Sequence, residues 1–141
     1  MSMVNGQWSM VSFAFFGTDE FSVIVLNELK KADFVPALVV TVPDRPKGRG
    51  LKLTPPPAKL WAEENNIPFL QPENLSPSKF KIPNSKFDVF IVAAYGKILP
   101  KTILDIPRCG VLNVHPSLLP LYRGPSPIEA QILDSAPEVG V

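Results

Sequence analysis

The segment 112–127, LNVHPSLLPLYRGPSP, contains one amide and one imidazole with a single residue between them. His115 is the only histidine of the chain, and Asn113 precedes it on a stretch that we expect to be a strand. Successive side chains of a strand point to opposite faces, so residues 113 and 115 should share one face. Together they can donate two hydrogen bonds to one developing oxyanion, which predicts acyl-transfer chemistry. The spacing alone favours the other interpretation, in which a lone histidine at a strand end has a structural role.

A stiff turn follows this pair. Pro116 and Pro120 restrict its backbone, and Leu118 and Leu119 offer an apolar wall. Backbone amides left free in such a turn can bind the polar edge of a flat heteroaromatic ring. Arg123 then precedes a Gly-Pro pair and serves either a substrate or simply the turn.

Positive charge gathers in one short segment of a chain whose net charge is only +1. Residues 43–59 carry five basic groups against the single acid Asp44. Because five prolines fall within 43–57, PDRPKGRGLKLTPPP, we expect neither helix nor strand there. A local charge of this kind predicts an anionic partner, and a solvated surface loop is the alternative.

The elements that must position these residues alternate along the chain between apolar runs and amphipathic stretches. The first helix, capped by Thr18 or Asp19, should bury the apolar stripe Phe21, Ile24, Val25 and Leu29. The expected strands are 12–17, 35–42, 67–72, 87–96 and 110–116, and the later helices are 58–66, 98–107 and 127–135. Strands that are apolar on both faces are typical of parallel sheets. The pattern predicts an α/β fold: a Rossmann-like, doubly wound, mainly parallel sheet with helices on both faces and a ligand site beyond the carboxyl ends of its strands.

Composition narrows the class of protein. The 141 residues are 45% hydrophobic, enough for one core, and no apolar run reaches the length of a membrane span. A single cysteine and the lack of a basic, signal-like start predict a cytoplasmic protein. The turn GTDEF after the first strand lacks the glycine fingerprint of a dinucleotide binder. We expect no metal site, and we expect residues 1–10 to form a leader outside the domain.

Residues 112–133, LNVHPSLLPLYRGPSPIEAQIL, resemble the signature of the folate-dependent formyltransferases, in which Asn-x-His-x-Ser-Leu-Leu-Pro and a later Arg-Gly recur. FFGTDEFSVIVLNEL at 15–29 and FDVFIVAAYGKILPKTILDIP at 87–107 resemble the family's opening strand and its folate-side loop. The resemblance extends over residues 12–141, nearly the whole chain.

This resemblance implies transfer of a formyl group from 10-formyltetrahydrofolate to an amine, through a tetrahedral intermediate that carries an oxyanion. By position, Asn113 and His115 would be the catalytic residues that stabilise the oxyanion and help to move a proton. The folate contacts that the resemblance implies are Ser117, Leu118, Leu119 and Pro120 on one side and Tyr95, Gly96, Ile98 and Leu99 on the other.

Residues 39–75 are similar to the branch of the family that formylates initiator methionyl-tRNA in translation initiation. The resemblance makes Arg45, Lys47, Arg49 and Lys52 the candidate contacts to RNA phosphates. Two other functions stay open at this point. One is a formyltransferase or formyl-folate hydrolase acting on another acceptor or on water. The other is a non-catalytic module that binds folate or a nucleotide.

The family's third catalytic residue, an aspartate, would fall beyond Val141. We therefore expect residues 11–141 to be the N-terminal catalytic domain of a longer protein, shortened here, with the C-terminal tRNA-binding domain absent. The 141-residue chain should then have little or no transfer activity of its own. The full-length protein is expected to be a monomer.

Overall fold

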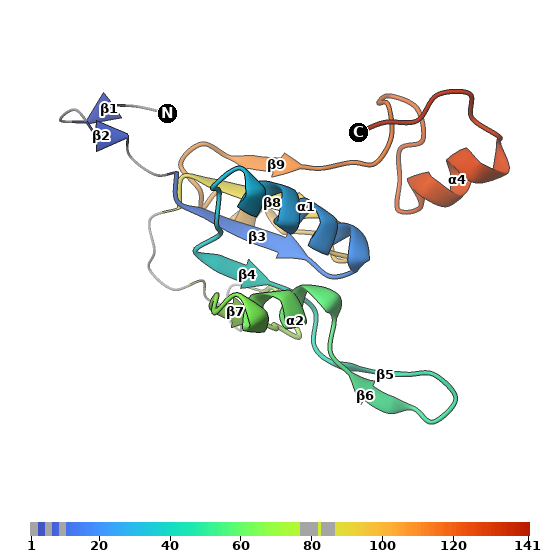
Figure 1. The fold of residues 1–141 in the computed structure, drawn as a ribbon, viewed down its shortest axis with the longest axis horizontal. Coiled ribbons are helices and arrows are strands. Elements are labelled where there is room, and N and C mark those ends of the chain that lie inside the picture. Colours follow the sequence, from blue (N-terminus) through green and yellow to red (C-terminus); the bar gives the residue numbers. More distant parts are fainter. Residues whose placement is uncertain (1–2, 5–6, 9–10, 77–81, 83–86) are drawn as a thin grey trace.

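A computed structural model describes residues 3–4, 7–8, 11–76, 82 and 87–141, and within them five parallel strands form the main sheet (Figure 1). The strands are β3 (Phe13–Gly17), β4 (Leu38–Val40), β7 (Phe69–Leu70), β8 (Val89–Ala93) and β9 (Val111–Asn113). Their order is β7-β4-β3-β8-β9, and every neighbouring pair is parallel. The Rossmann-like, mainly parallel sheet expected from the sequence is confirmed.

The chain winds outward from β3 in both directions. β4 and β7 follow β3 toward one edge, and the chain then returns to place β8 on the other side of β3. β3 and β8 pair along their whole length, from Phe13 opposite Val89 to Gly17 opposite Ala93. The winding direction therefore reverses between β3 and β8. Sheets of this type bind ligands at such a switch point.

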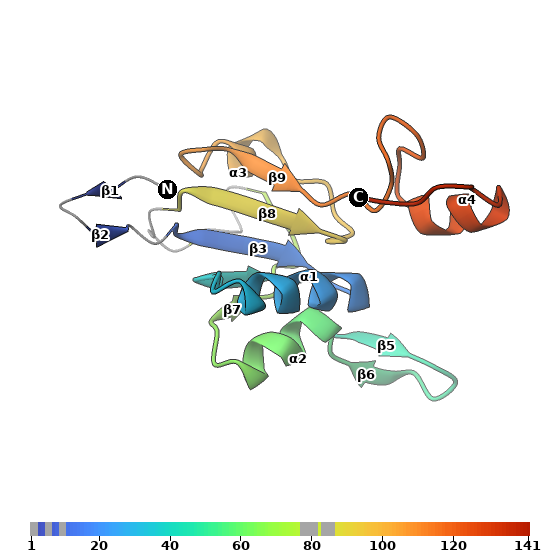
Figure 2. The ribbon, with the colours of Figure 1, turned by 45° about the horizontal axis from the view of Figure 1, so that its top comes forward.

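Helices cover both faces of the sheet. The helices α1 (Glu20–Lys31) and α2 (Pro57–Glu64) pack on one face (Figure 2), and the short α3 (Lys101–Leu104) contributes Ile103 to the core of the other. The first core contains Phe13, Phe15, Leu26, Val39, Ala58, Trp61, Ala62 and Ala93. The second contains Ala14, Phe16, Leu38, Val40, Leu75, Phe87, Phe90, Tyr95 and Ile103. Alternate residues of β3 and β4 thus enter opposite cores, which is why these strands are apolar throughout.

The buried face of α1 differs in one respect from the apolar stripe expected from the sequence. Asp19 caps the helix as predicted, since its carboxylate accepts a hydrogen bond from the Ser22 N–H at 3.2 Å. Leu26 is fully buried, whereas Ile24 is 59% exposed, so its predicted burial is wrong. Besides Leu26, the fully buried position of α1 is Ser22, a polar residue that hydrophobic periodicity ignores.

Ser22 takes that position because Gly17 has no side chain. A Cβ at residue 17 would lie 2.7 Å from the Ser22 Cβ and 2.5 Å from the ring of Phe15. The buried Ser22 hydroxyl accepts from the Thr18 N–H and donates to the Ala93 carbonyl, both at 2.7 Å. One serine therefore joins the carboxyl ends of β3 and β8.

The expectation that residues 43–57 contain no strand is wrong. β5 (Arg45–Lys47) and β6 (Lys52–Thr54) form an antiparallel hairpin that projects from the body (Figures 1 and 2). Its turn is accommodated by Gly48 and Leu51, whose φ angles are +77° and +46°. Proline is tolerated at edge positions of a ladder, so the many prolines did not prevent pairing.

Other elements are found where expected and are mostly shorter. The helix expected at 58–66 is Pro57–Glu64, that at 98–107 is Lys101–Leu104, and that at 127–135 is α4 (Pro127–Leu133). Within the first ten residues, β1 (Met3–Val4) and β2 (Gln7–Trp8) pair antiparallel. Most of the irregular stretch expected at 73–87 lies outside the described residues. No helix in the described part of the chain has the length and apolar character to cross a bilayer.

Candidate active site

A cavity of about 730 Å³ opens at the carboxyl ends of β3, β8 and β9. Its walls come from five segments: the start of α1, the end of β8 with the loop after it, Leu104 on α3, β9 with the residues behind it, and the start of α4 with the loop before it. Its size falls within the roughly 300–1,000 Å³ usual for small-molecule sites. The cavity also adjoins the switch point between β3 and β8, where a ligand site was expected.

Asn113 and His115 both line this cavity. The strand itself ends at Asn113, so His115 lies just beyond it and the expected strand 110–116 is too long. The Val114 N–H nevertheless donates to the Val92 carbonyl at 2.8 Å, which keeps the chain extended beside β8 past the end of the ladder. This contact explains how residues on either side of Val114 border one cavity.

The imidazole of His115 is held by a main-chain contact. Its Nε2 lies 3.0 Å from the carbonyl oxygen of Tyr122. A carbonyl only accepts hydrogen bonds, so Nε2 carries a proton in this arrangement. Tyr122 itself has a φ of +54°, a left-handed backbone that turns the chain back toward the histidine.

Buried Ser117 stabilises the same turn. Its N–H donates to the His115 carbonyl and its hydroxyl donates to the Leu121 carbonyl, both at 2.8 Å. The predicted folate contacts Ser117, Leu118, Leu119 and Pro120 do not line the cavity beside His115. Leu118 instead lies against Gly140, where an added Cβ would be 2.5 Å from its Cδ2. Folate contact by these four residues stays a prediction.

The second predicted set of folate contacts borders the cavity in full. Tyr95, Gly96, Ile98 and Leu99 all line it, on the loop after β8. The Thr18 hydroxyl donates to the Tyr95 carbonyl at 2.7 Å, joining this loop to the loop after β3. The Tyr95 ring is buried edge-on against Phe16, and this burial raises the pKa of its phenol to about 12. The side chain of Ile98, by contrast, is 93% exposed at the rim.

Several lining residues were not predicted, among them Phe21, Ile128 and Glu129. The last two belong to α4, whose position depends on Gln131. The buried Gln131 amide donates to the carbonyls of Pro116 and Pro127, each at 2.8 Å, and so fastens α4 to the residue after His115. No local pattern marks this glutamine, because one of its acceptors lies fifteen residues away.

The candidate RNA contacts lie apart from the cavity. Arg45, Lys47, Arg49 and Lys52 are all exposed on the β5–β6 hairpin and none lines the cavity. Lys59, the fifth basic group of this region, is paired with Asp44 at 2.8 Å. The hairpin therefore presents four cations that have no ion-pair partner among the described residues. It projects beyond the end of the sheet toward which the arrows of β3 and β4 point (Figure 1).

Comparison with known proteins gives matches over most of the chain. The family model described as formyl transferase matches residues 11–141. The methionyl-tRNA formyltransferase of Nitrosomonas europaea is 46% identical over 129 residues, covering 90% of this chain and 40% of the relative. The enzyme of the same name from Thermotoga maritima is 45% identical, covering 90% of this chain and 41% of its own length. The chain thus spans about two fifths of these curated relatives.

Solved structures share the fold at lower identity. Glycinamide ribonucleotide transformylase 1 from Geobacillus kaustophilus superposes with a TM-score of 0.59 at 22% identity, covering 91% of this chain and 69% of the other. The protein of that name from Symbiobacterium toebii gives 0.64 at 14% identity, covering 99% and 67%. At such identities the likeness supports the fold.

Proposed function

Since the chain belongs to the formyl transferase family, we propose that the complete protein transfers a formyl group from 10-formyltetrahydrofolate to the α-amino group of initiator methionyl-tRNA. The observation that carries this proposal is the cavity shared by Asn113, His115 and the loop Tyr95–Leu99. Residues 11–141 would form the N-terminal catalytic domain, preceded by a leader and followed by a tRNA-holding domain. We also propose that the complete protein is cytoplasmic and that it is a monomer.

In the proposed reaction the amine nitrogen attacks the formyl carbon. A new C–N bond forms, the carbonyl oxygen becomes an oxyanion, and the bond from the formyl carbon to the folate nitrogen then breaks. The amine loses a proton and the departing folate nitrogen gains one. The Asn113 amide would donate to the oxyanion, a contribution typically worth about 3 kcal/mol. His115 would take the proton that the amine loses on its basic ring nitrogen Nδ1, because its Nε2–H is engaged by the Tyr122 carbonyl.

The wall formed by the loop after β8 suits a flat heteroaromatic donor. It combines apolar side chains, Ile98 and Leu99, with the backbone of Gly96, which has no side chain to block approach. Ligand sites typically pair apolar walls with a few fixed polar groups. The Thr18–Tyr95 hydrogen bond holds this loop against the end of β3, so the wall is preformed.

The hairpin favours a tRNA acceptor over a small amine. A compact acceptor would be held within the cavity and would have no use for cations on an arm outside it. Phosphates of an RNA stem can be neutralised one by one by Arg45, Lys47, Arg49 and Lys52, and each such contact steepens the dependence of affinity on salt. The relatives that are about 45% identical carry the name methionyl-tRNA formyltransferase.

The test uses the complete protein with formyl-folate and three acceptors: methionyl-tRNA, glycinamide ribonucleotide and water. We expect turnover with methionyl-tRNA. Arg49→Glu should raise the KM for tRNA and leave folate binding unchanged, whereas Lys31→Glu, the same charge change on α1, should alter neither. If Arg49→Glu weakened the binding of tRNA and of folate equally, the assignment of Arg49 as an RNA contact would be contradicted. Folate binding without turnover on any acceptor would favour a non-catalytic binding module.

A further inference from the structure

The β5–β6 hairpin is weakly tied to the rest of the protein. Among the described residues, the hydrogen bonds of residues 45–54 all run within the hairpin: between the paired strands, across the turn or within β6. The leucines of this segment, Leu51 and Leu53, are 73% and 62% exposed, so no apolar anchor holds it against the sheet. The direction in which the hairpin projects must therefore be set at its base.

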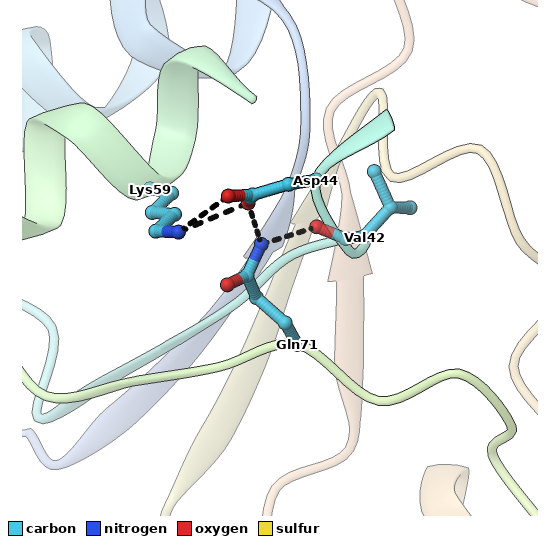
Figure 3. Close-up of polar contacts among 4 residues, drawn as sticks. All are labelled: Val42, Asp44, Lys59 and Gln71. Carbon is cyan, nitrogen blue, oxygen red and sulfur yellow. Dashed lines mark hydrogen bonds and ion pairs between the residues drawn. The ribbon is translucent and has the colours of Figure 1, made fainter. Parts of the chain in front are cut away.

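At that base, Asp44 joins three segments of the chain (Figure 3). The Lys59 ammonium, from α2, donates to both carboxylate oxygens of Asp44, at 3.0 and 2.8 Å. The Gln71 amide, from the segment after β7, donates to the same carboxylate at 2.6 Å and to the Val42 carbonyl at 2.9 Å. Asp44 immediately precedes β5, so these contacts fix the residue from which the hairpin leaves the body.

This ion pair is more enclosed than the others in the described residues. The side chains of Lys59 and Asp44 are 17% and 24% exposed, whereas those of the pair Lys101–Asp105 are 84% and 60% exposed. Solvent and salt screen an enclosed pair less than an exposed one, so its geometry is better maintained. The hydrogen bonds from Gln71 and from Lys59 hold the pKa of the Asp44 carboxyl below its ordinary value, which keeps the acceptor charged.

Small changes at the base are amplified at the tip. Arg49 is five residues from Asp44, roughly 17 Å at about 3.3 Å per residue. A tilt of about 20° at Asp44 would move the tip by roughly 6 Å, twice the length of a hydrogen bond. A contact between Arg49 and a given phosphate therefore depends on a fixed base.

We propose that Asp44 is a positioning residue that, through Lys59 and Gln71, sets the direction of the β5–β6 hairpin and thereby the place at which its four cations meet the phosphates of the acceptor RNA. The inference rests on the proposed function, because it deepens the account of how the same protein recognises its RNA acceptor. Asp44 contacts neither RNA nor folate in this scheme.

The experiment compares the complete wild-type protein with Asp44→Asn and Lys59→Met. Asp88→Asn is the matched control, since Asp88 is 27% exposed and also forms a 2.8 Å ion pair, with Arg108, away from the hairpin. The first measurement is the rate of native-state trypsin cleavage after Lys47, Arg49 and Lys52. The second is a set of steady-state constants: the KM for methionyl-tRNA, the KM for formyl-folate and kcat.

Asp44→Asn and Lys59→Met should each speed hairpin cleavage and raise the KM for tRNA by about five- to tenfold, with the folate KM and kcat within about twofold of wild type. The double variant should be no worse than either single variant, because both remove one interaction. Asp88→Asn should behave as wild type in both measurements.

Three results would overturn the inference and leave the proposed function standing: unchanged cleavage and unchanged tRNA KM, faster cleavage with unchanged tRNA KM, or an equal rise in cleavage for Asp88→Asn. A wild-type protein that does not use methionyl-tRNA at all would instead overturn the proposed function, and this inference with it. The wild-type assay alone therefore separates the two failures.

Discussion

The Nε2 of His115 and the main-chain oxygen of Tyr122 lie 3.0 Å apart, and this contact fixes the ring of the only histidine. Because the acceptor is a backbone carbonyl, no substitution of the Tyr122 side chain removes it directly. The left-handed backbone of Tyr122 and the two hydrogen bonds of Ser117 maintain the turn that places this carbonyl. The orientation of the candidate catalytic histidine is thus a property of the turn that follows it.

This contact predicts the tautomer of His115. At a pH where the ring is neutral, Nε2 should carry the proton and Nδ1 should not. Nitrogen-15 NMR of histidine-labelled protein measures this directly, with the signals assigned by their loss in His115→Asn. A Ser117→Ala variant should increase the population of the other tautomer, because the turn loses the bond to Leu121. A neutral ring protonated at Nδ1 in the wild type would contradict the geometry.

Asn113→Ala should lower kcat of the complete protein with methionyl-tRNA by about 10²- to 10³-fold, the usual effect of removing one oxyanion donor. The adjacent Leu112→Ala is the matched control, because Leu112 is 62% exposed and does not line the cavity. The KM for formyl-folate should change little in either variant. A loss of less than about threefold in Asn113→Ala would remove this residue from the proposed mechanism.

Gly17→Ala should destabilise the fold. The new Cβ would lie 2.5 Å from the Phe15 ring and 2.7 Å from Ser22, and overpacking of this kind typically costs about 1–3 kcal/mol. Gly50→Ala is the control, since nothing lies within 4 Å of the Cβ it would add. Urea denaturation of both variants measures the difference. Equal stability would show that α1 can shift to make room.

Burial of the Tyr95 phenol predicts that the folded protein loses stability at high pH. Its pKa is raised to about 12 in the folded protein, above the value of about 10 for an unperturbed tyrosine. Between these values the unfolded state has lost its proton while the folded state keeps it, so the free energy of unfolding falls as pH rises. The contribution of the protonated Tyr95 phenol to the free energy of unfolding is fully present below a pH of about 10 and is lost as pH rises through about 12.

Urea denaturation between pH 9 and 12 checks this point. Tyr95→Phe should make the decline shallower, because it removes the group whose proton is held by folding. Tyr122→Phe is the matched control, in which Tyr95 is retained and the decline should persist. An identical decline in wild type and Tyr95→Phe would mean that other groups account for it.

The fold was readable from the sequence because its signals are local. Continuous apolar runs such as FAFFG and VFIVA predicted parallel strands that bury both faces, and the structure confirms this. The cavity was anticipated for a related reason: in a parallel sheet the loops after successive strands meet at one edge, so Asn113, His115 and Tyr95 converge there. Alternation alone placed Asn113 and His115 together, although the ladder ends between them.

Other features depend on partners that are distant in the sequence, and these were missed. Ile24 fits the helical period of the apolar stripe, yet it is exposed, whereas Ser22 is buried and donates to Ala93, which lies 71 residues away. The hairpin was not predicted from the sequence because backbone pairing, not side-chain alternation, holds Arg45–Lys47 against Lys52–Thr54. Nothing in the order of residues indicates that Leu118 would lie against Gly140 instead of facing the cavity.

The sequence by itself determined the layers, the parallel strands and the chemistry available at the sheet edge, since hydrophobic period and residue type are properties of short segments. Only the tertiary structure decided which nitrogen of His115 is protonated, how Gln131 fastens α4, and that Asp44 is held by Lys59 and Gln71. Each of these depends on a hydrogen bond between segments that meet only after the sheet has formed. Such bonds act over about 3 Å, and no local pattern records which distant groups folding will bring within that distance.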